Sequence, residues 1–154
     1  MAPAVGWPSA LRRVPVITAP RQVVWERLTD PDFIAASAPG VESVEAVDPR
    51  RFTVVSGLGL GPMKVRFTMD VELFDVVERE SLRMRSLAKG PGSMVDVVSV
   101  VRLEDAQAGT RLNWSATSDV SGTVANLGPR LIEGTARMMS ERFWTDFARR
   151  VSLG

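Results

Sequence analysis

The sequence predicts an α+β domain in which a curved antiparallel β-sheet covers one long C-terminal helix. Three observations lead to this fold class. Apolar residues recur at intervals of three and four from Ile132 to Val151, as they do on one face of a helix. Between residues 41 and 120, apolar and polar residues alternate in several runs, as in strands with one buried face. Prolines and glycines separate these runs, so successive strands are expected to pair as neighbours.

The N-terminal part of the domain predicts one strand followed by two short helices. The segment from Leu11 to Thr18 is rich in β-branched residues, and Pro15 indicates an edge strand because proline has no amide hydrogen to donate. A first helix is expected from Pro20 to Leu28 and a second from Pro31 to Ser37. Asp30 can cap the second helix, because proline is favoured in the first turn that follows a cap.

Six strands are expected after these helices, beginning near residues 41, 51, 63, 82, 95 and 112. The run from residue 63 shows the pattern best, because Val65, Phe67 and Met69 alternate with charged or polar residues. The order of elements is therefore one strand, two helices, six strands and one helix, or β-α-α-β6-α.

The C-terminal helix is expected from Pro129 to Val151. Proline is tolerated in the first turn of a helix, and Gly128 frees the backbone just before it. At 1.5 Å per residue, about 22 residues give a rod of roughly 33 Å, which is long enough to cross a small domain. Four residues lie beside its apolar stripe and make the buried face wide and partly polar: Leu131, Thr135, Met138 and Arg142.

The composition indicates one globular domain and excludes several functions. Of the 154 residues, 45% are hydrophobic and 24% charged, and the net charge of +1 gives no basis for nucleic-acid binding. Apolar runs fall short of the roughly 18 residues that span a bilayer, and the first residues lack the pattern of a secretory signal. We therefore expect a leader over residues 1–10, a single domain over residues 11–154, and a cytoplasmic protein with at most peripheral membrane contact.

The chain contains no cysteine, histidine or tyrosine. Thiolate nucleophiles, imidazole bases and the usual zinc, copper or haem ligands are thereby excluded. The carboxylates do not cluster in any loop, as a carboxylate metal site would require. We expect no catalytic residue, no metal and no cofactor.

Methionine and tryptophan are frequent at positions predicted to face the interior. Methionine adapts to irregular space and to varied ligands, although simple core packing explains the same residues as well. Arg142 would anchor a carbonyl, a quinone oxygen or a carboxylate, or else extend into solvent or pair with a neighbour such as Glu141 or Asp146. The candidate ligand-binding residues are Trp25, Phe67, Met69, Met84, Val97, Ser99, Trp114, Leu131, Thr135, Met138, Met139 and Arg142.

The segment Gly57-Leu58-Gly59-Leu60-Gly61-Pro62 is expected to be a loop. It does not bind phosphate in the usual way, because no Lys-Ser/Thr pair follows it and no GxGxxG motif is complete. One interpretation is a plain hairpin loop whose glycines adopt positive φ angles. The other is an apolar lid in which Leu58 and Leu60 meet a ligand or a membrane surface at the mouth of a cavity.

Several short motifs occur in a specific order along the chain: Asp30-Pro31, Ala38-Pro39-Gly40-Val41, Gly61-Pro62, Gly109-Thr110-Arg111-Leu112 with Trp114, Val120-Ser121-Gly122, and Gly128 with Arg130-Leu131-Ile132. Over about residues 11–151 the sequence resembles the CoxG family of carbon monoxide dehydrogenase subunits, within the START-like (SRPBCC) superfamily. This resemblance implies the helix-grip fold of START-like and Bet v 1-like proteins. Phe143-Trp144 stands where that family tends to carry two phenylalanines. Longer members continue into a tail thought to associate with membranes, whereas this chain stops at Gly154.

The resemblance also implies a function. It implies a non-catalytic protein that binds a lipophilic small molecule, such as an isoprenoid quinone, in a cavity between sheet and helix. It further implies an accessory role to a molybdenum-containing CO dehydrogenase or related hydroxylase, whose subunits would be partners. Two alternatives stay open. One is a polyketide cyclase or dehydratase that uses Arg, Asp or Glu in the same cavity, and the other is an interaction module with a collapsed core.

Overall fold

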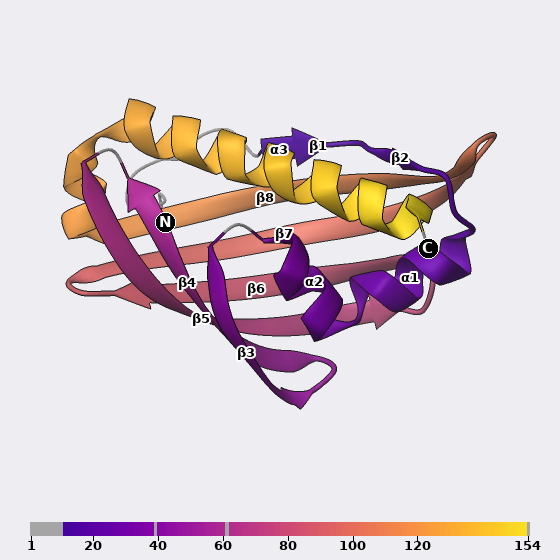
Figure 1. The fold of residues 1–154 in the computed structure, drawn as a ribbon, viewed down its shortest axis with the longest axis horizontal. Coiled ribbons are helices and arrows are strands. Elements are labelled where there is room, and N and C mark those ends of the chain that lie inside the picture. Colours follow the sequence, from indigo (N-terminus) through magenta and orange to yellow (C-terminus); the bar gives the residue numbers. More distant parts are fainter. Residues whose placement is uncertain (1–10, 39, 61, 154) are drawn as a thin grey trace.

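The computed structural model describes residues 11–38, 40–60 and 62–153 and has the expected α+β architecture (Figure 1). The leader expected over residues 1–10 lies outside the described residues. The elements follow in the order β1 (Leu11–Arg13), β2 (Val16–Ile17), α1 (Arg21–Leu28), α2 (Pro31–Ser37), β3 (Val41–Asp48), β4 (Arg51–Leu60), β5 (Met63–Val77), β6 (Ser81–Gly90), β7 (Ser93–Ala106), β8 (Gly109–Gly122), the short 3-10 helix η1 (Thr123–Leu127) and α3 (Pro129–Leu153).

The strands form one antiparallel sheet in the order β1-β8-β7-β6-β5-β4-β3, and β2 also pairs with β8. Strands β3 to β8 are therefore neighbours both in sequence and in space, as the alternation and the turn residues predict. Long antiparallel strands twist, and here the sheet curves around α3, which runs across its inner face (Figure 1). The predicted fold of a curved antiparallel sheet around a C-terminal helix is confirmed.

The opening strand differs from the prediction because Pro15 divides it in two. β1 and β2 lie on either side of this residue, and both pair with β8. Pro15 cannot donate a hydrogen bond, but its carbonyl oxygen accepts one of 3.0 Å from the amide of Leu112. The chain thus stays beside β8 through the interruption.

The glycine-rich segment also differs from the prediction. Gly57 pairs with Arg66 and Gly59 with Lys64, so β4 continues to Leu60. The expectation of a loop was wrong for residues 57–60, and Leu58 and Leu60 lie in a strand. Glycine has no side chain that could show the alternation of a strand, although its backbone can pair like that of any other residue.

The helices begin and end close to the predicted residues. Asp30 caps α2, because its Oδ1 accepts hydrogen bonds from the amides of Asp32 (3.1 Å) and Phe33 (3.5 Å). α3 begins at Pro129 as predicted and continues to Leu153. No described helix has both the length and the apolar character that a membrane crossing requires.

Two hydrophobic clusters join the helices to the sheet. The larger one contains Trp144, Phe147 and Val151 from the C-terminal half of α3, together with residues of α1, α2 and several strands. Phe147 is fully buried, and its ring meets that of Phe33 edge to face at 5.6 Å. The smaller cluster contains Val65, Phe67, Val120 and Val124. The middle of the inner face of the sheet lies between these two clusters.

Candidate functional site

The middle of the inner face is incompletely packed. Val97 on β7 is half-buried and belongs to neither hydrophobic cluster of the described residues. Its partners in register are Ser86 on β6 and Ser118 on β8, and both are also half-buried. Side chains in a protein core normally interlock at crystal-like density, so partial exposure at these inward positions indicates accessible space beside the sheet.

Helix α3 provides the opposite wall of this space. Ile132 packs against the smaller cluster and Phe143 against the larger one. Ala136 and Met139 lie between them on the same helical stripe, are half-buried, and belong to neither cluster. Sheet and helix are therefore held together at both ends of the interface and less tightly in its middle.

The structure divides the predicted ligand-binding residues by their packing. Trp25 and Phe67 are only 7% and 3% exposed and belong to different clusters. Three more are half-buried against the larger cluster, namely Met69, Met84 and Trp114. A further group is partly or largely buried outside both clusters: Val97, Ser99, Leu131, Thr135 and Met139. Met138 is 46% exposed and Arg142 is exposed as well. Among these residues, Met84 and Ser99 are direct cross-strand partners.

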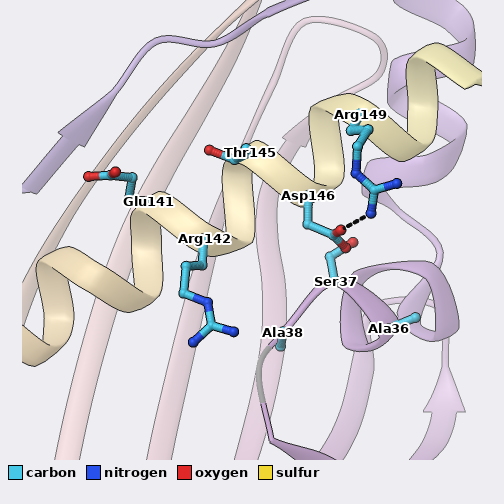
Figure 2. A pocket seen from close by; sticks show the side chains of 8 residues that line it. All are labelled: Ala36, Ser37, Ala38, Glu141, Arg142, Thr145, Asp146 and Arg149. Atoms are coloured by element: carbon cyan, nitrogen blue, oxygen red, sulfur yellow. Dashed lines mark hydrogen bonds and ion pairs between the residues drawn. The ribbon is translucent and has the colours of Figure 1, made fainter.

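The predicted polar residues on α3 have different surroundings. The hydroxyl of Thr135 donates a 2.8 Å hydrogen bond to the carbonyl of Leu131 one turn earlier, so its proton is already used. Arg142 extends from α3 toward Ala38 and forms no bond with the other residues drawn (Figure 2). Pairing with Glu141 or Asp146, one of the alternatives, is not formed among these residues, and Arg142 is exposed to solvent.

Arg142 lines a hollow of about 490 Å³ between the end of α2 and α3. Asp146 and Arg149 form an ion pair along its wall (Figure 2). The complete lining is Ala36, Ser37, Ala38, Glu141, Arg142, Thr145, Asp146 and Arg149. The hollow is therefore polar and charged, unlike the space between sheet and helix.

A second hollow of about 440 Å³ lies beside the glycine-rich part of β4 and is lined by Glu42, Gly57, Gly59, Lys64, Val65 and Arg66. Arg66 pairs with Glu42 across it at 3.1 Å. This hollow borders the strand that holds Leu58 and Leu60. Their contact with a ligand or a membrane surface stays a prediction.

Sequence reasoning missed Ser86 and Ser118 as candidate site residues. Both occupy inward positions in runs whose alternation was visible, between Met84 and Ala88 and between Ala116 and Val120. A hydroxyl at an inward position of an otherwise apolar face was the signal that could have identified them.

Arg85 on β6 and Asp96 on β7 lie on the outer face of the sheet, whereas Arg13 on β1 is opposite Trp114 on the inner face and pairs with Glu141 of α3 at 3.9 Å. A hydrogen bond of 2.8 Å from Arg85 to Asp96 raises the pKa of this guanidinium above its ordinary value, with help from the charge of the same carboxylate. Within the part of the chain that the structure describes, no three acidic side chains gather closely enough to hold a metal ion. The part of the inner face between the two clusters offers apolar surface and hydroxyl groups.

The family model for the carbon monoxide dehydrogenase protein CoxG matches residues 16–152. The chain belongs to the CoxG family. The resemblance that the sequence motifs indicated is thereby confirmed over nearly the whole domain. No curated protein matches this CoxG-family sequence at a significant level.

Solved structures share the fold of this CoxG-family chain at low identity. A conserved protein from Geobacillus kaustophilus has a TM-score of 0.81 and 19% identity, with 93% of this chain and 92% of that chain covered. A START superfamily protein from Mycobacterium smegmatis has a TM-score of 0.68 and 9% identity, with 94% and 97% covered. The ZhuI aromatase/cyclase from Streptomyces sp. R1128 has a TM-score of 0.67 and 17% identity, with 93% of each chain covered. The START-like helix-grip fold is therefore shown.

Proposed function

We propose that this CoxG-family protein binds a lipophilic small molecule between the sheet and α3 and catalyses no reaction itself. The observation that supports this proposal is the partial burial of Val97 and Met139 between two well-packed clusters. Apolar side chains that line an unfilled interior gain stability when an apolar molecule covers them. A ligand that buries roughly 300 Å² of apolar surface would gain about 7 kcal/mol before the cost of association is subtracted.

The proposed ligand is an isoprenoid quinone, and the proposed partner is a molybdenum-containing CO dehydrogenase or a related hydroxylase. The description of the family, as a subunit of carbon monoxide dehydrogenase, supports the partner. The apolar walls of the space support a hydrophobic ligand of this kind. In this role the protein would hold the molecule that exchanges electrons with the enzyme.

Native mass spectrometry of the protein purified from its host tests the binding proposal. We expect an additional mass that corresponds to a co-purified hydrophobic molecule, and we expect its loss after extraction into organic solvent. Tryptophan fluorescence, to which the half-buried Trp114 contributes together with three other tryptophans, should then respond when quinone or fatty-acid analogues are added to the stripped protein. An unliganded mass together with no response to the whole panel would favour an interaction module with a collapsed core.

The partner is tested separately by affinity purification of the tagged protein from cells that express the hydroxylase. Recovery of the molybdenum-containing subunits supports the accessory role. If they are absent from a preparation that retains the ligand, the binding proposal stands and the partner proposal fails.

A cyclase or dehydratase is the second candidate, because the aromatase/cyclase from Streptomyces has the same fold. At 17% identity that likeness carries no activity with it. Since the chain has no histidine, tyrosine or cysteine, an enzyme would depend on arginines, carboxylates and hydroxyls. Incubation with a linear poly-β-ketone thioester, followed by mass spectrometry for loss of water, would reveal such an activity.

A further inference from the structure

Three serines surround Val97 on the inner face of the sheet. Ser86 on β6 and Ser118 on β8 are its direct cross-strand partners. Ser99 follows Val97 by two positions on β7, and residues two apart in a strand point to the same face. The three hydroxyl groups therefore belong to adjacent strands and to one small area of the interior wall.

Three other buried hydroxyl groups have hydrogen-bond partners within the protein. Ser93 accepts a hydrogen bond of 3.0 Å from the amide of Val124, Ser37 donates to the carbonyl of Phe33 at 3.2 Å, and Thr110 donates to the carbonyl of Ala19 at 2.8 Å. These partners compensate for the loss of water on burial.

Ser99 is also buried, with 4% exposure, but its hydroxyl makes no side-chain hydrogen bond to the described residues. The same holds for Ser86 and Ser118, which are half-buried. Ser56 is the buried serine whose hydroxyl is sealed from solvent without a partner. The hydroxyl of Ser99 is not sealed in this way, so it faces the accessible space between sheet and helix. A hydroxyl at such a position can bond to water in the free protein, and a ligand that displaces this water must supply a polar atom in its place.

We propose that Ser86, Ser99 and Ser118 form a subsite for an uncharged oxygen of the lipophilic ligand, such as a carbonyl or hydroxyl oxygen. This inference rests on the proposed function and adds that the site selects lipophilic molecules that carry an uncharged oxygen. In an antiparallel sheet, diagonal neighbours such as Ser99 and Ser118 have side chains roughly 7 Å apart at their bases. One ligand oxygen between two such hydroxyls can therefore lie within about 2.8 Å of both.

The surroundings favour an uncharged group over a carboxylate. The residues directly opposite the serines or between them are Val71, Met84, Val97 and Ala116, and none of them carries a charge. Serine hydroxyls can donate to an oxygen, but they supply no positive charge to balance an anion. A buried carboxylate without a cationic partner is strongly unfavourable, so this subsite discriminates against it.

Two ligands of nearly equal shape test the proposal, namely 2-acetonaphthone, which has a carbonyl group, and 2-ethylnaphthalene, which has a methylene group in its place. Binding is measured by calorimetry with the wild-type protein and with the triple variant Ser86→Ala, Ser99→Ala and Ser118→Ala. We expect the triple variant to bind the ketone about three- to thirtyfold more weakly, because one or two hydrogen bonds are lost. We expect the hydrocarbon to bind the triple variant as tightly as the wild-type protein, or slightly more tightly.

Ser56→Ala is the matched control, because it removes an inward hydroxyl that the space does not reach. It should leave the affinities for both ligands unchanged. The infrared stretching band of the ketone gives a second measurement that does not depend on protein stability. This band should shift to lower frequency when the ketone binds the wild-type protein, and the shift should disappear in the triple variant.

The outcomes separate the two proposals. If both ligands bind and the triple variant weakens them equally, or if the carbonyl band does not shift, the hydroxyl subsite is overturned while lipophilic binding stands. If neither ligand binds to the wild-type protein, the proposed function itself fails and the subsite fails with it.

Discussion

Gly40 precedes β3 and allows a close backbone contact between the start of this strand and β4. Its φ is +75°, and its carbonyl oxygen accepts a 2.9 Å hydrogen bond from the amide of Gly57. A Cβ atom at Gly40 would lie only 2.2 Å from the carbonyl oxygen of Gly57. Left-handed backbone is unfavourable for alanine and the backbone contact would have to open, so Gly40→Ala should lower the free energy of unfolding by about 2–3 kcal/mol.

Urea unfolding followed by circular dichroism measures this loss, and Gly134→Ala provides the matched control. Gly134 lies within α3, and no heavy atom lies within 4 Å of the position of its added Cβ. Alanine should therefore raise the stability by about 0.5–1 kcal/mol, because it is the better helix former. Equal effects of the two substitutions would show that the close approach at Gly40 is not retained in solution.

Ligand binding should depend more on Met139 than on Arg142. Met139 is half-buried beside the unpacked space, whereas Arg142 is exposed in the neighbouring hollow. Met139→Trp fills ligand volume and should weaken binding of a quinone analogue by more than about tenfold. Arg142→Ala removes at most one polar contact and should weaken binding of the same analogue by about two- to tenfold.

Fluorescence titration measures both affinities. Met94→Trp on the exposed outer face is the control, because it shows whether an indole added away from the site changes the affinity for the ligand. Met94 is 41% exposed, so this change should leave affinity unaltered. Should Arg142→Ala abolish binding while Met139→Trp has no effect, the ligand would be anionic and the cyclase candidate would gain support.

At the scale of elements, Arg150 attaches α2 to α3. Its Nη1 donates to the carbonyl oxygen of Phe33 at 3.2 Å and to the hydroxyl of Ser37 at 2.9 Å. The guanidinium also lies 4.3 Å from the centre of the Phe33 ring, within the range of a cation–π contact. Arg150→Ala should therefore lower the free energy of unfolding by about 1–3 kcal/mol and loosen α2.

Arg149→Ala is the natural comparison for that substitution. Arg149 is exposed and pairs with Asp146 on the same helix, a type of ion pair that contributes only about 0.3–0.5 kcal/mol. Hydrogen exchange should show faster exchange of the α2 amides in Arg150→Ala and little change in Arg149→Ala. Unchanged α2 protection in both variants would mean that the larger cluster alone fixes this helix.

Sequence predicted the elements well wherever side chains carry the signal. The alternation of Val65, Phe67 and Met69 identifies β5 because one face of the strand is buried and the other is wet. The same logic failed for residues 57–60, where alternate glycines remove the pattern while backbone pairing with β5 continues. Pro15 correctly indicates an edge strand, but the sequence alone does not show that this residue divides the strand in two.

The candidate site was less predictable, because it depends on how far α3 stands from the sheet. Periodicity placed both Trp25 and Val97 on interior faces, yet Trp25 packs in the larger cluster and Val97 in neither. The exposure of Val97 is decided by helix–sheet packing, which no local pattern records. The grouping of Ser86 with Ser118 likewise depends on the register of three strands.

At the scale of the whole molecule, two packed clusters hold the ends of the sheet–helix interface and leave its middle less tightly filled. A ligand in that middle would contact strands that belong to both clusters, and it would bind the folded chain in preference to the unfolded one. Such a ligand stabilises the fold by mass action, by about 2.7 kcal/mol when its free concentration is 100 times the dissociation constant. For a domain of this size, 1 kcal/mol corresponds to roughly 2–4 °C in the melting temperature.

Removal of the co-purified ligand should therefore lower the melting temperature by about 5–11 °C, and addition of a quinone analogue should restore it. Calorimetry of the loaded, stripped and refilled protein measures these changes, with native mass spectrometry to verify occupancy. Met139→Trp is the informative variant, because an indole that occupies the ligand volume should make its melting temperature insensitive to the added analogue. Identical melting temperatures for loaded and stripped wild-type protein would show that the bound molecule does not prefer the folded chain, which contradicts binding in the interior. The space between Val97 and Met139 would then have no role in binding.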